Sequence, residues 1–249
     1  MTNINWDHSA KLGQLQAVVD PSDQLGYKNR LIDCIHWNAL RKILTFNHSK
    51  QLLDFGCGTG RFATRIKSLG IDYTGIDSSP VMIETARSLH RSPPIHFVYF
   101  DGFKIPFSDK SFDTCISCGV FQYLIYQPGV QEILTEIRRI LVPGGHLIMI
   151  EQASLSNQAS GTVARASTES DYLAEVSKLF RIEAVRRVRS CRLSTVTSIF
   201  HRVSRNFPWL LGLLMNRFAE RELRKALNAS DTYFVRIEYY DMMIVAIVP

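Results

Sequence analysis

The middle of the chain alternates between two hydrophobic patterns. Short apolar runs of about five residues are typical of buried strands, and longer stretches with an apolar residue every three or four positions are typical of amphipathic helices. The short runs predict strands at 51–55, 72–76, 95–100, 112–117 and 146–150. The longer stretches predict helices at about 61–69, 80–90 and 129–141. Because strands and helices alternate, we expect an α/β fold with a mostly parallel sheet and helices on both faces.

The two ends of the chain differ from this middle part. Apolar residues recur at helical spacing up to Asn47, which predicts a helical lead-in ahead of the first strand. The lead-in residues that could face a pocket are Trp6, Asp7, His8 and Tyr27. Beyond the fifth strand we expect a polar loop, a helix, a strand, a helical insert and a last strand, at 152–168, 169–180, 181–188, about 190–230 and 242–248.

We interpret residues 1–249 as one domain with three parts. The helical lead-in covers residues 1–50 and the alternating core covers residues 51–151. Residues 152–249 complete the sheet and carry the helical insert. A chain of this length is sufficient for one well-filled domain with an elaboration.

Composition adds an expectation about the compartment. The chain is 46% hydrophobic and 21% charged, as is ordinary for a globular protein. Its first residues show neither the basic nor the apolar region of a signal peptide, and its apolar runs are shorter than the ~20 residues of a membrane helix. Five scattered cysteines fit a reducing environment, so we expect a cytoplasmic protein. Cys115 and Cys118 have the spacing of a metal or redox pair, but they straddle a strand end and have no second pair, so we expect neither use.

The candidate ligand site begins at the first strand. There the apolar run Leu52-Leu53-Asp54-Phe55 breaks into Gly56-Cys57-Gly58-Thr59-Gly60. Glycine tolerates a positive φ and has no Cβ, so the backbone of such a turn can touch a bound molecule. The helix that follows presents free N–H groups to the same place. An empty tight turn is the structural alternative, and the rest of the motif pattern argues against it.

Three acidic residues close three successive strands, at Asp54, Asp77 and Asp101. The carboxyl ends of parallel strands meet at one edge of the sheet, where open α/β sheets bind their ligands. Asp77 could accept hydrogen bonds from both ribose hydroxyls of a nucleoside, and Asp101 from an exocyclic amine. Met82, in the first turn of the next helix, could lie flat on a purine, although core packing explains it equally well.

These segments resemble the class I S-adenosylmethionine-dependent methyltransferases. The resemblance covers about residues 45–151. Residues 52–60 are similar to the family's first motif, and Gly75–Pro80 with Met82 to its ribose and adenine segment. Asp101-Gly102 resembles the adenine-edge motif, and 112–124 and 141–147 resemble the fourth strand with its loop and the turn into the fifth strand. A dehydrogenase is the alternative, but its Gly-x-Gly-x-x-Gly fingerprint is replaced here by Gly-x-Gly-x-Gly.

The resemblance implies a Rossmann-like sheet of seven strands whose last strand is antiparallel and lies beside the fifth. It implies S-adenosylmethionine as cofactor, S-adenosylhomocysteine as product and no metal. The residues that it places around the cofactor are Asp54, Gly56, Cys57, Gly58, Gly60, Asp77, Ser78, Met82, Asp101, Gly102, Phe103 and Cys118.

A hydroxyl acceptor needs a base, whereas an amine or a thiolate needs one less. The candidate bases near the carboxyl edge are Glu151, at the end of the fifth strand, and Tyr123, in the loop after the fourth. Many similar enzymes carry histidine where Tyr123 stands, so a histidine-based scheme is in doubt. His201, in the helical insert, is a third candidate. A structural role is the alternative for each of them.

The acceptor is the least determined part. The loop 117–120 lacks the motifs that similar enzymes use on nucleobases, so nucleic acid is disfavoured. We expect a small-molecule or glycan acceptor, including anionic ones, methylated on a hydroxyl of a sugar or natural product. The alternatives are a lipid-linked or macromolecular acceptor at a membrane surface, and a protein that binds S-adenosylmethionine without catalysis.

The net charge of +6 bears on the same question. Residues 181–225 hold eleven Lys and Arg against three Asp and Glu, so the basic excess belongs to one C-terminal segment. Within it, residues 199–218 combine apolar residues with Arg202, Arg205 and Arg217. We interpret this segment as a lid over the acceptor. The alternatives are an interfacial membrane helix and a solvated basic face.

Overall fold

The computed structural model describes residues 6–10, 15, 19, 23, 26–91, 95–154, 167–189, 208–228 and 239–249. These residues form one seven-stranded sheet in the order β3-β2-β1-β4-β5-β7-β6. The strands are β1 (Gln51–Phe55), β2 (Asp72–Asp77), β3 (His96–Tyr99), β4 (Phe112–Cys118), β5 (Leu141–Ser154), β6 (Arg181–Arg189) and β7 (Tyr239–Ile247).

The sheet confirms the predicted α/β class and strand placement. β1 pairs in parallel with β2 and with β4, and β2–β3 and β4–β5 are also parallel. β7 runs antiparallel between β5 and β6, as expected for the last strand. β5 differs most from its prediction, because it begins at Leu141 and includes the predicted turn Pro143-Gly144-Gly145. The pairing shifts register there, since Leu141 pairs with Phe112 and His146 with Thr114, and the Gly144 N–H donates to the Val248 carbonyl at 3.1 Å.

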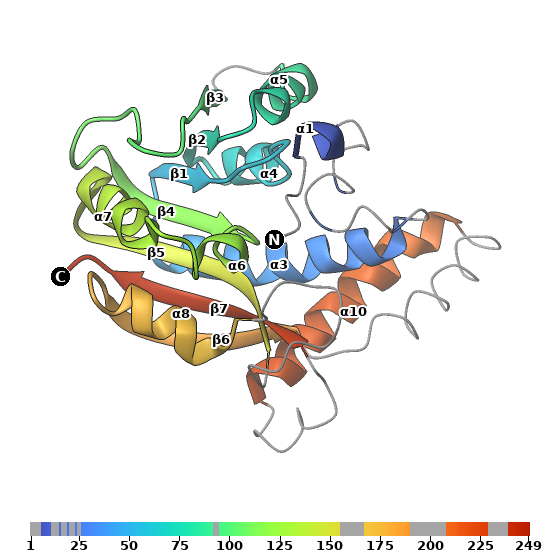
Figure 1. Ribbon diagram of the computed structural model, residues 1–249. Coiled ribbons are helices and arrows are strands. Elements are labelled where there is room, and N and C mark those ends of the chain that lie inside the picture. The colour runs from blue at the N-terminus through green and yellow to red at the C-terminus, as the bar shows by residue number, and fades with distance from the viewer. Residues whose placement is uncertain are drawn as a thin grey trace.

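Helices cover both faces of the sheet (Figure 1). One face carries α6 (Phe121–Leu124), α7 (Val130–Ile140) and α8 (Glu169–Val176), which share one hydrophobic core with the strands. The other carries the C-terminal part of α3 (Tyr27–Phe46), α4 (Ala63–Lys67) and α5 (Pro80–Leu89), around a second core. Two helices are shorter than predicted: α4 covers Ala63–Lys67 where 61–69 was expected, and α8 covers Glu169–Val176 where 169–180 was expected.

Local sequence explains where α5 begins. Ser79 has an extended backbone and its hydroxyl accepts a hydrogen bond from the Met82 N–H at 3.1 Å, which satisfies one of the free donors of the first turn. Pro80 follows at the first helical position, where its missing N–H costs nothing. The helix thus begins directly after the acid that ends β2.

The helical insert was predicted as a lid, and its described part is a helix, α10 (Pro208–Asn228). Its buried residues Leu211, Met215 and Ala219 pack against Leu31, Ile32 and Ile35 of α3 (Figure 1). This part of α10 therefore packs on the lead-in helix, and a lid formed by the insert over the acceptor stays a prediction. Arg202, Arg205 and His201 lie outside the described residues. No described helix has the length and apolar content to cross a bilayer.

Candidate functional site

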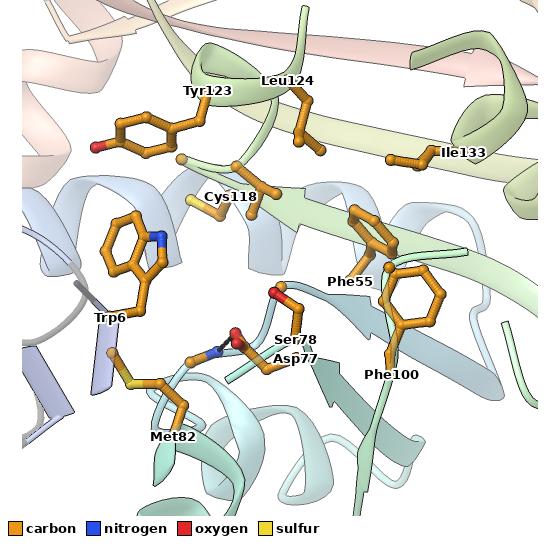
Figure 2. A pocket seen from close by; sticks show the side chains of 15 residues that line it. Trp6, Phe55, Asp77, Ser78, Met82, Phe100, Cys118, Tyr123, Leu124 and Ile133 are labelled. Atoms are coloured by element: carbon orange, nitrogen blue, oxygen red, sulfur yellow. Dashed lines mark hydrogen bonds between the residues drawn. The ribbon is translucent and has the colours of Figure 1, made fainter. Parts of the chain in front are cut away.

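A cavity of about 230 Å³ lies at the carboxyl edge of the sheet, above the ends of β1, β2 and β4 (Figure 2). Seven of the residues predicted to hold the cofactor line it, from four separate segments of the chain. They are Gly56, Gly58, Asp77, Ser78, Met82, Gly102 and Cys118. The other lining residues are Trp6, Phe55, Phe100, Gly119, Val120, Tyr123, Leu124 and Ile133.

The glycine turn forms the floor of the cavity. Gly56 and Gly58 have φ values of 71° and 53°, which glycine adopts without strain. The N–H groups of Gly56 and Cys57 both donate to the Ile76 carbonyl at 2.9 Å, which ties the turn to β2. A Cβ on Gly56 would collide with the side chain of Val120. The turn therefore needs glycine both for its conformation and for close packing.

Gly60 and Cys57 belong to the same motif but not to the cavity wall. A Cβ on Gly60 would lie 2.8 Å from the ring of Phe97, so this glycine serves the packing of the sheet. Cys57 is buried, and its sulfur lies where a Cβ on Gly75 would come within 2.8 Å. Burial raises the pKa of the Cys57 thiol well above its usual value. Both residues shape the turn from behind.

Asp77 is the acid at the cavity. One of its carboxylate oxygens accepts a hydrogen bond from the Gly58 N–H at 2.8 Å (Figure 2). The other accepts one from the Ser79 N–H at 2.9 Å. Burial raises the pKa of Asp77, and the backbone donors act against that shift. Each oxygen has a further lone pair, so the carboxylate can still accept from a ligand diol. These contacts join the end of β2 to the glycine turn.

Asp54, by contrast, lies beneath the turn and not in the cavity wall. It is 3% exposed and accepts a hydrogen bond from the Tyr73 hydroxyl at 2.7 Å. Burial raises the pKa of Asp54 to about 7, although the Tyr73 hydrogen bond and the Arg61 charge lower it. Its side chain therefore links β1 to β2, and it does not line the cavity where the cofactor is expected.

The predicted adenine-edge segment reaches the cavity only through its backbone. Gly102 lines the cavity with Phe100, whereas the Asp101 carboxylate accepts from the N–H groups of Phe103 and Lys104 at 2.9 and 3.4 Å. Phe103 is 81% exposed. Asp101 thus holds the turn that follows β3. Its predicted contact with an exocyclic amine stays a prediction.

The lead-in closes one side of the cavity. Trp6, in α1 (Trp6–Ser9), meets Tyr123 of α6 edge to face, with ring centroids 5.3 Å apart (Figure 2). Asp7 accepts a hydrogen bond from the Ser79 hydroxyl, which fixes α1 on the start of α5. Trp6 therefore faces the pocket, while Tyr27 packs with the α3–α10 core. The side chain of His8 lies outside the described residues.

Glu151, a predicted base, is buried under α6. Its Oε1 accepts from the N–H groups of Val120 and Phe121, both at 3.2 Å, and its Oε2 accepts from the Gln122 N–H at 3.1 Å. Burial raises its pKa to about 8, against the effect of these donors. A carboxylate with this many backbone partners positions the loop that carries Tyr123, and it does not line the cavity.

Sequence reasoning missed the apolar wall formed by Phe55, Phe100 and Ile133. Phe55 and Phe100 are the last apolar residues of their predicted strands, and this strand-end position could have indicated them. Ile133 lies on α7, whose helical pattern gives no sign of which residue reaches the sheet edge. Cys115 and Cys118 lie in different cores, as expected from their positions on β4.

Comparisons with known proteins agree with this site. A methyltransferase domain family matches residues 53–149. An uncharacterized methyltransferase of Mycobacterium tuberculosis (strain H37Ra) is 33% identical over 100 residues, which cover 40% of this chain and 38% of the relative. A demethylmenaquinone methyltransferase of Tropheryma whipplei (strain Twist) is 30% identical over 159 residues, covering 60% of this chain and 65% of the relative. The match thus spans less than two thirds of either relative.

Solved structures share the fold at low identity. The phosphoethanolamine N-methyltransferase 2 of Haemonchus contortus, in complex with S-adenosyl-L-methionine, superposes with a TM-score of 0.59 and 19% identity, over 86% of this chain and 53% of that one. The [4+2]-cyclase SpnF superposes with a TM-score of 0.58 and 20% identity, over 97% of each chain. Residues 53–149 thus match a methyltransferase domain, and the seven-stranded sheet and the cavity at the glycine turn are those that the resemblance to class I S-adenosylmethionine-dependent methyltransferases predicted.

Proposed function

We propose that the protein transfers a methyl group from S-adenosylmethionine to a hydroxyl group of a small molecule, a natural product or a sugar. The observation that carries the proposal is the meeting of the glycine turn with Asp77 in one cavity wall. Gly56 and Gly58 bring bare backbone to the floor, and the Asp77 carboxylate is fixed beside it by a 2.8 Å hydrogen bond from Gly58.

The residues present fit this cofactor. Gly56 packs its backbone closely against Val120, and Gly58 has a left-handed φ and no side chain where it lines the cavity, so the turn leaves the cavity open to a ligand. The Asp77 carboxylate can accept from a ribose diol, and Met82 and Phe100 offer polarisable and aromatic surface for a purine. When bound, S-adenosylmethionine supplies a methyl carbon activated by a positive sulfur.

The chain's own part in the reaction is alignment and exclusion of water. Reactants held in line gain an effective molarity worth up to roughly 7–11 kcal/mol of the barrier. Trp6, Val120 and Leu124 present apolar surface on the acceptor side of the cavity, which favours an acceptor with an apolar or aromatic face. Tyr123 contributes to the same wall, and its hydroxyl is our candidate for proton transfer there. Glu151 supports this wall through its three backbone partners.

A second candidate acceptor is a lipophilic ring compound at a membrane surface. The name of the Tropheryma whipplei relative, a demethylmenaquinone methyltransferase, favours it, and the apolar wall is compatible with such a ring. The exposed Arg186 of β6 would supply a contact to an anionic surface or acceptor. Arg189 on the same strand is not available for this, because it is buried against Asp241.

Calorimetry with S-adenosylmethionine and S-adenosylhomocysteine tests the cofactor site. Asp77→Ala should weaken binding, since a hydrogen bond to a charged group is worth about 1.5–3 kcal/mol. Asp72→Ala is the matched control, because Asp72 begins the same strand but is exposed and pairs with Lys67 at 2.6 Å. Equal affinity in both folded variants would refute the assignment of Asp77.

The acceptor is identified by turnover. A panel of sugars, phenolic natural products and a short-chain demethylquinol is incubated with the protein and S-adenosylmethionine, and mass spectrometry follows the gain of one methylene mass. Methylation of a hydroxyl compound supports the first proposal, and methylation of the quinol ring supports the second. Tight cofactor binding without turnover on any member of the panel would contradict both.

A further inference from the structure

A group of polar side chains lies behind the cavity wall at Cys118. Cys118, the last residue of β4, lines the cavity, and its sulfur has two polar neighbours. It lies 2.7 Å from Nη2 of Arg61 and 3.5 Å from Nδ1 of His36, which comes from α3. His36 and Arg61 carry no part of the family motif that predicted the site. The fold brings them together because α3 packs along the sheet beside the glycine turn.

The other ring nitrogen of His36 is held by a carboxylate. Nε2 of His36 lies 2.8 Å from Oδ2 of Asp241, on β7. Arg189 donates to both oxygens of Asp241, at 2.6 and 2.8 Å. Burial alone would raise the pKa of Asp241, but the charge and hydrogen bonds of Arg189 and the hydrogen bond of His36 lower it overall. Asp241 is therefore a carboxylate, and it fixes the tautomer of His36 with the proton on Nε2.

This tautomer leaves the lone pair of Nδ1 facing both Nη2 of Arg61, at 3.4 Å, and the Cys118 sulfur, at 3.5 Å. Burial and the charges of Arg61 and Arg189 lower the pKa of His36, so the resting ring is neutral, and the hydrogen bond and charge of Asp241 are what favour its protonated form. The side chains of His36 and Asp241 are 10% and 7% exposed, which excludes bulk water from the pair. Activated cysteine and serine nucleophiles share one arrangement: the nucleophile is next to a base, and a third group orients that base by a hydrogen bond.

The charged groups around the thiol come from every element packed against it. Arg61 donates to the sulfur from the start of the α4 segment, and Asp33 of α3 is 3.7 Å from Arg61 and 2.7 Å from Arg65. The carboxylates of Glu151, Asp54 and Asp241 act on the thiol from a greater distance. Burial raises the pKa of Cys118 to about 12, and the Arg61 charge opposes this. The resting side chain is thus a thiol that needs a base to react.

We propose that Cys118, His36 and Asp241 form a nucleophilic thiol site, and that Cys118 accepts a methyl group from a sulfonium donor in the cavity. In this step a bond forms between Sγ of Cys118 and the methyl carbon. The bond between that carbon and the sulfonium sulfur breaks, and its electron pair stays on the departing sulfur. The thiol proton passes to Nδ1 of His36, and the Asp241 carboxylate stabilises the imidazolium. The ligand class rests on the proposed function, whereas the activated thiol does not.

The thiol is tested first without cofactor. The full-length protein is treated with iodoacetamide between pH 6 and 9, and peptide mass spectrometry gives a separate rate for each cysteine. Cys34, which is partly exposed and lies outside the cavity lining, is the internal reference. A thiol without a base reacts through its thiolate, so its rate rises about tenfold per pH unit below its pKa. At Cys118 we expect a nearly flat profile from pH 7 to 9, because neutral His36 takes the proton throughout this range.

His36→Gln should restore the tenfold slope and lower the rate of Cys118 at pH 7 by about 100-fold, as for loss of a general base. Asp241→Asn should give an intermediate loss. If these variants do not fold, the profile of the natural protein decides alone. A slope at Cys118 equal to that at Cys34 would overturn the activated thiol.

The methyl step is tested with S-adenosylmethionine and no acceptor. We expect the Cys118 peptide to gain the mass of one methylene group, and the Cys34 peptide to gain none. Calorimetry on the same sample reports cofactor binding separately. Binding without the mass gain overturns the methyl-acceptor role and leaves the proposed function intact. Absence of binding refutes the proposed function, and the alkylation profile still decides the thiol.

Discussion

The half of the molecule that forms the cavity floor is built from one continuous stretch of the chain. The half that supports this floor is built from segments that lie far apart in the sequence. The floor and its acid come from one contiguous stretch, β1 to β2, in which the turn after β1 is bonded to Ile76 and Asp77. The supporting half joins segments from both ends of the chain, since α3 packs on α10 and its His36 pairs with Asp241 of β7. The first half is encoded locally, and the second exists only after the chain has folded.

This difference decides how each half tolerates change. In the local half a single backbone position determines whether a ligand fits, because glycine is required by φ and by close approach. In the assembled half many side chains contribute to the packing, and loss of one mainly lowers the stability of the whole domain. The first half should therefore respond to substitution in binding, and the second in stability.

The largest effect should follow from Gly58→Val. A branched side chain at φ 53° strains the turn and enters the cavity, so affinity for S-adenosylhomocysteine should fall below the range that calorimetry can measure. Gly70→Val is the matched control, because Gly70 has a similar φ of 77° but meets no atom that a Cβ would touch. It should lose stability and keep its affinity. Normal binding by a folded Gly58→Val protein would show that the ligand lies elsewhere.

The same difference explains how far sequence reasoning reached. The positions of the strands and the glycine turn were predictable because each of them is encoded by a short, continuous stretch of the chain. The orientation of individual side chains was not. Asp54 and Asp77 both end strands, yet Asp54 turns under the sheet toward Tyr73 while Asp77 faces the turn. Which acid faces the ligand depends on neighbours from another strand.

The assembled half was predicted least well for the same reason. The apolar periodicity of α10 indicates a buried face, but it does not indicate which partner covers that face. Covering by α3 requires contacts between residues near 31–35 and 211–219 that no local pattern contains. The pairing of His36 with Asp241 spans 205 positions along the chain and is equally invisible in the sequence.

A change in the α3–α10 core should give the next largest effect. Met215 is 3% exposed and packs between the two helices, so Met215→Ala should lower the free energy of unfolding by about 2–5 kcal/mol. Urea denaturation measures this loss. Leu213→Ala is the control on the same helix, because Leu213 is 54% exposed and should cost little. The affinity for S-adenosylmethionine should be unchanged in both. A large loss of affinity in Met215→Ala would mean that α10 does reach the cofactor.

The last effect is a dependence of stability on pH and concerns Glu151, which lies between the two halves because it joins β5 to the loop at the cavity. Burial raises its pKa to about 8 in the folded protein, against about 4.3 in the unfolded chain. Between these values the native state keeps a proton that the unfolded state releases. The free energy of unfolding must therefore fall as pH rises through this window, by at most about 1.4 kcal/mol per pH unit from this group.

Glu151→Gln carries no titrating proton, so it should flatten this part of the pH dependence between pH 5 and 8 in urea denaturation. Glu132→Gln, at an exposed position of α7, should keep the slope of the natural protein. If the Glu151→Gln slope also equals the natural one, the three backbone N–H donors keep the carboxylate ionised despite its burial. In that case Glu151 would hold the cavity loop as an ionised carboxylate, and the position of the loop would depend on the supporting half of the molecule throughout this pH range.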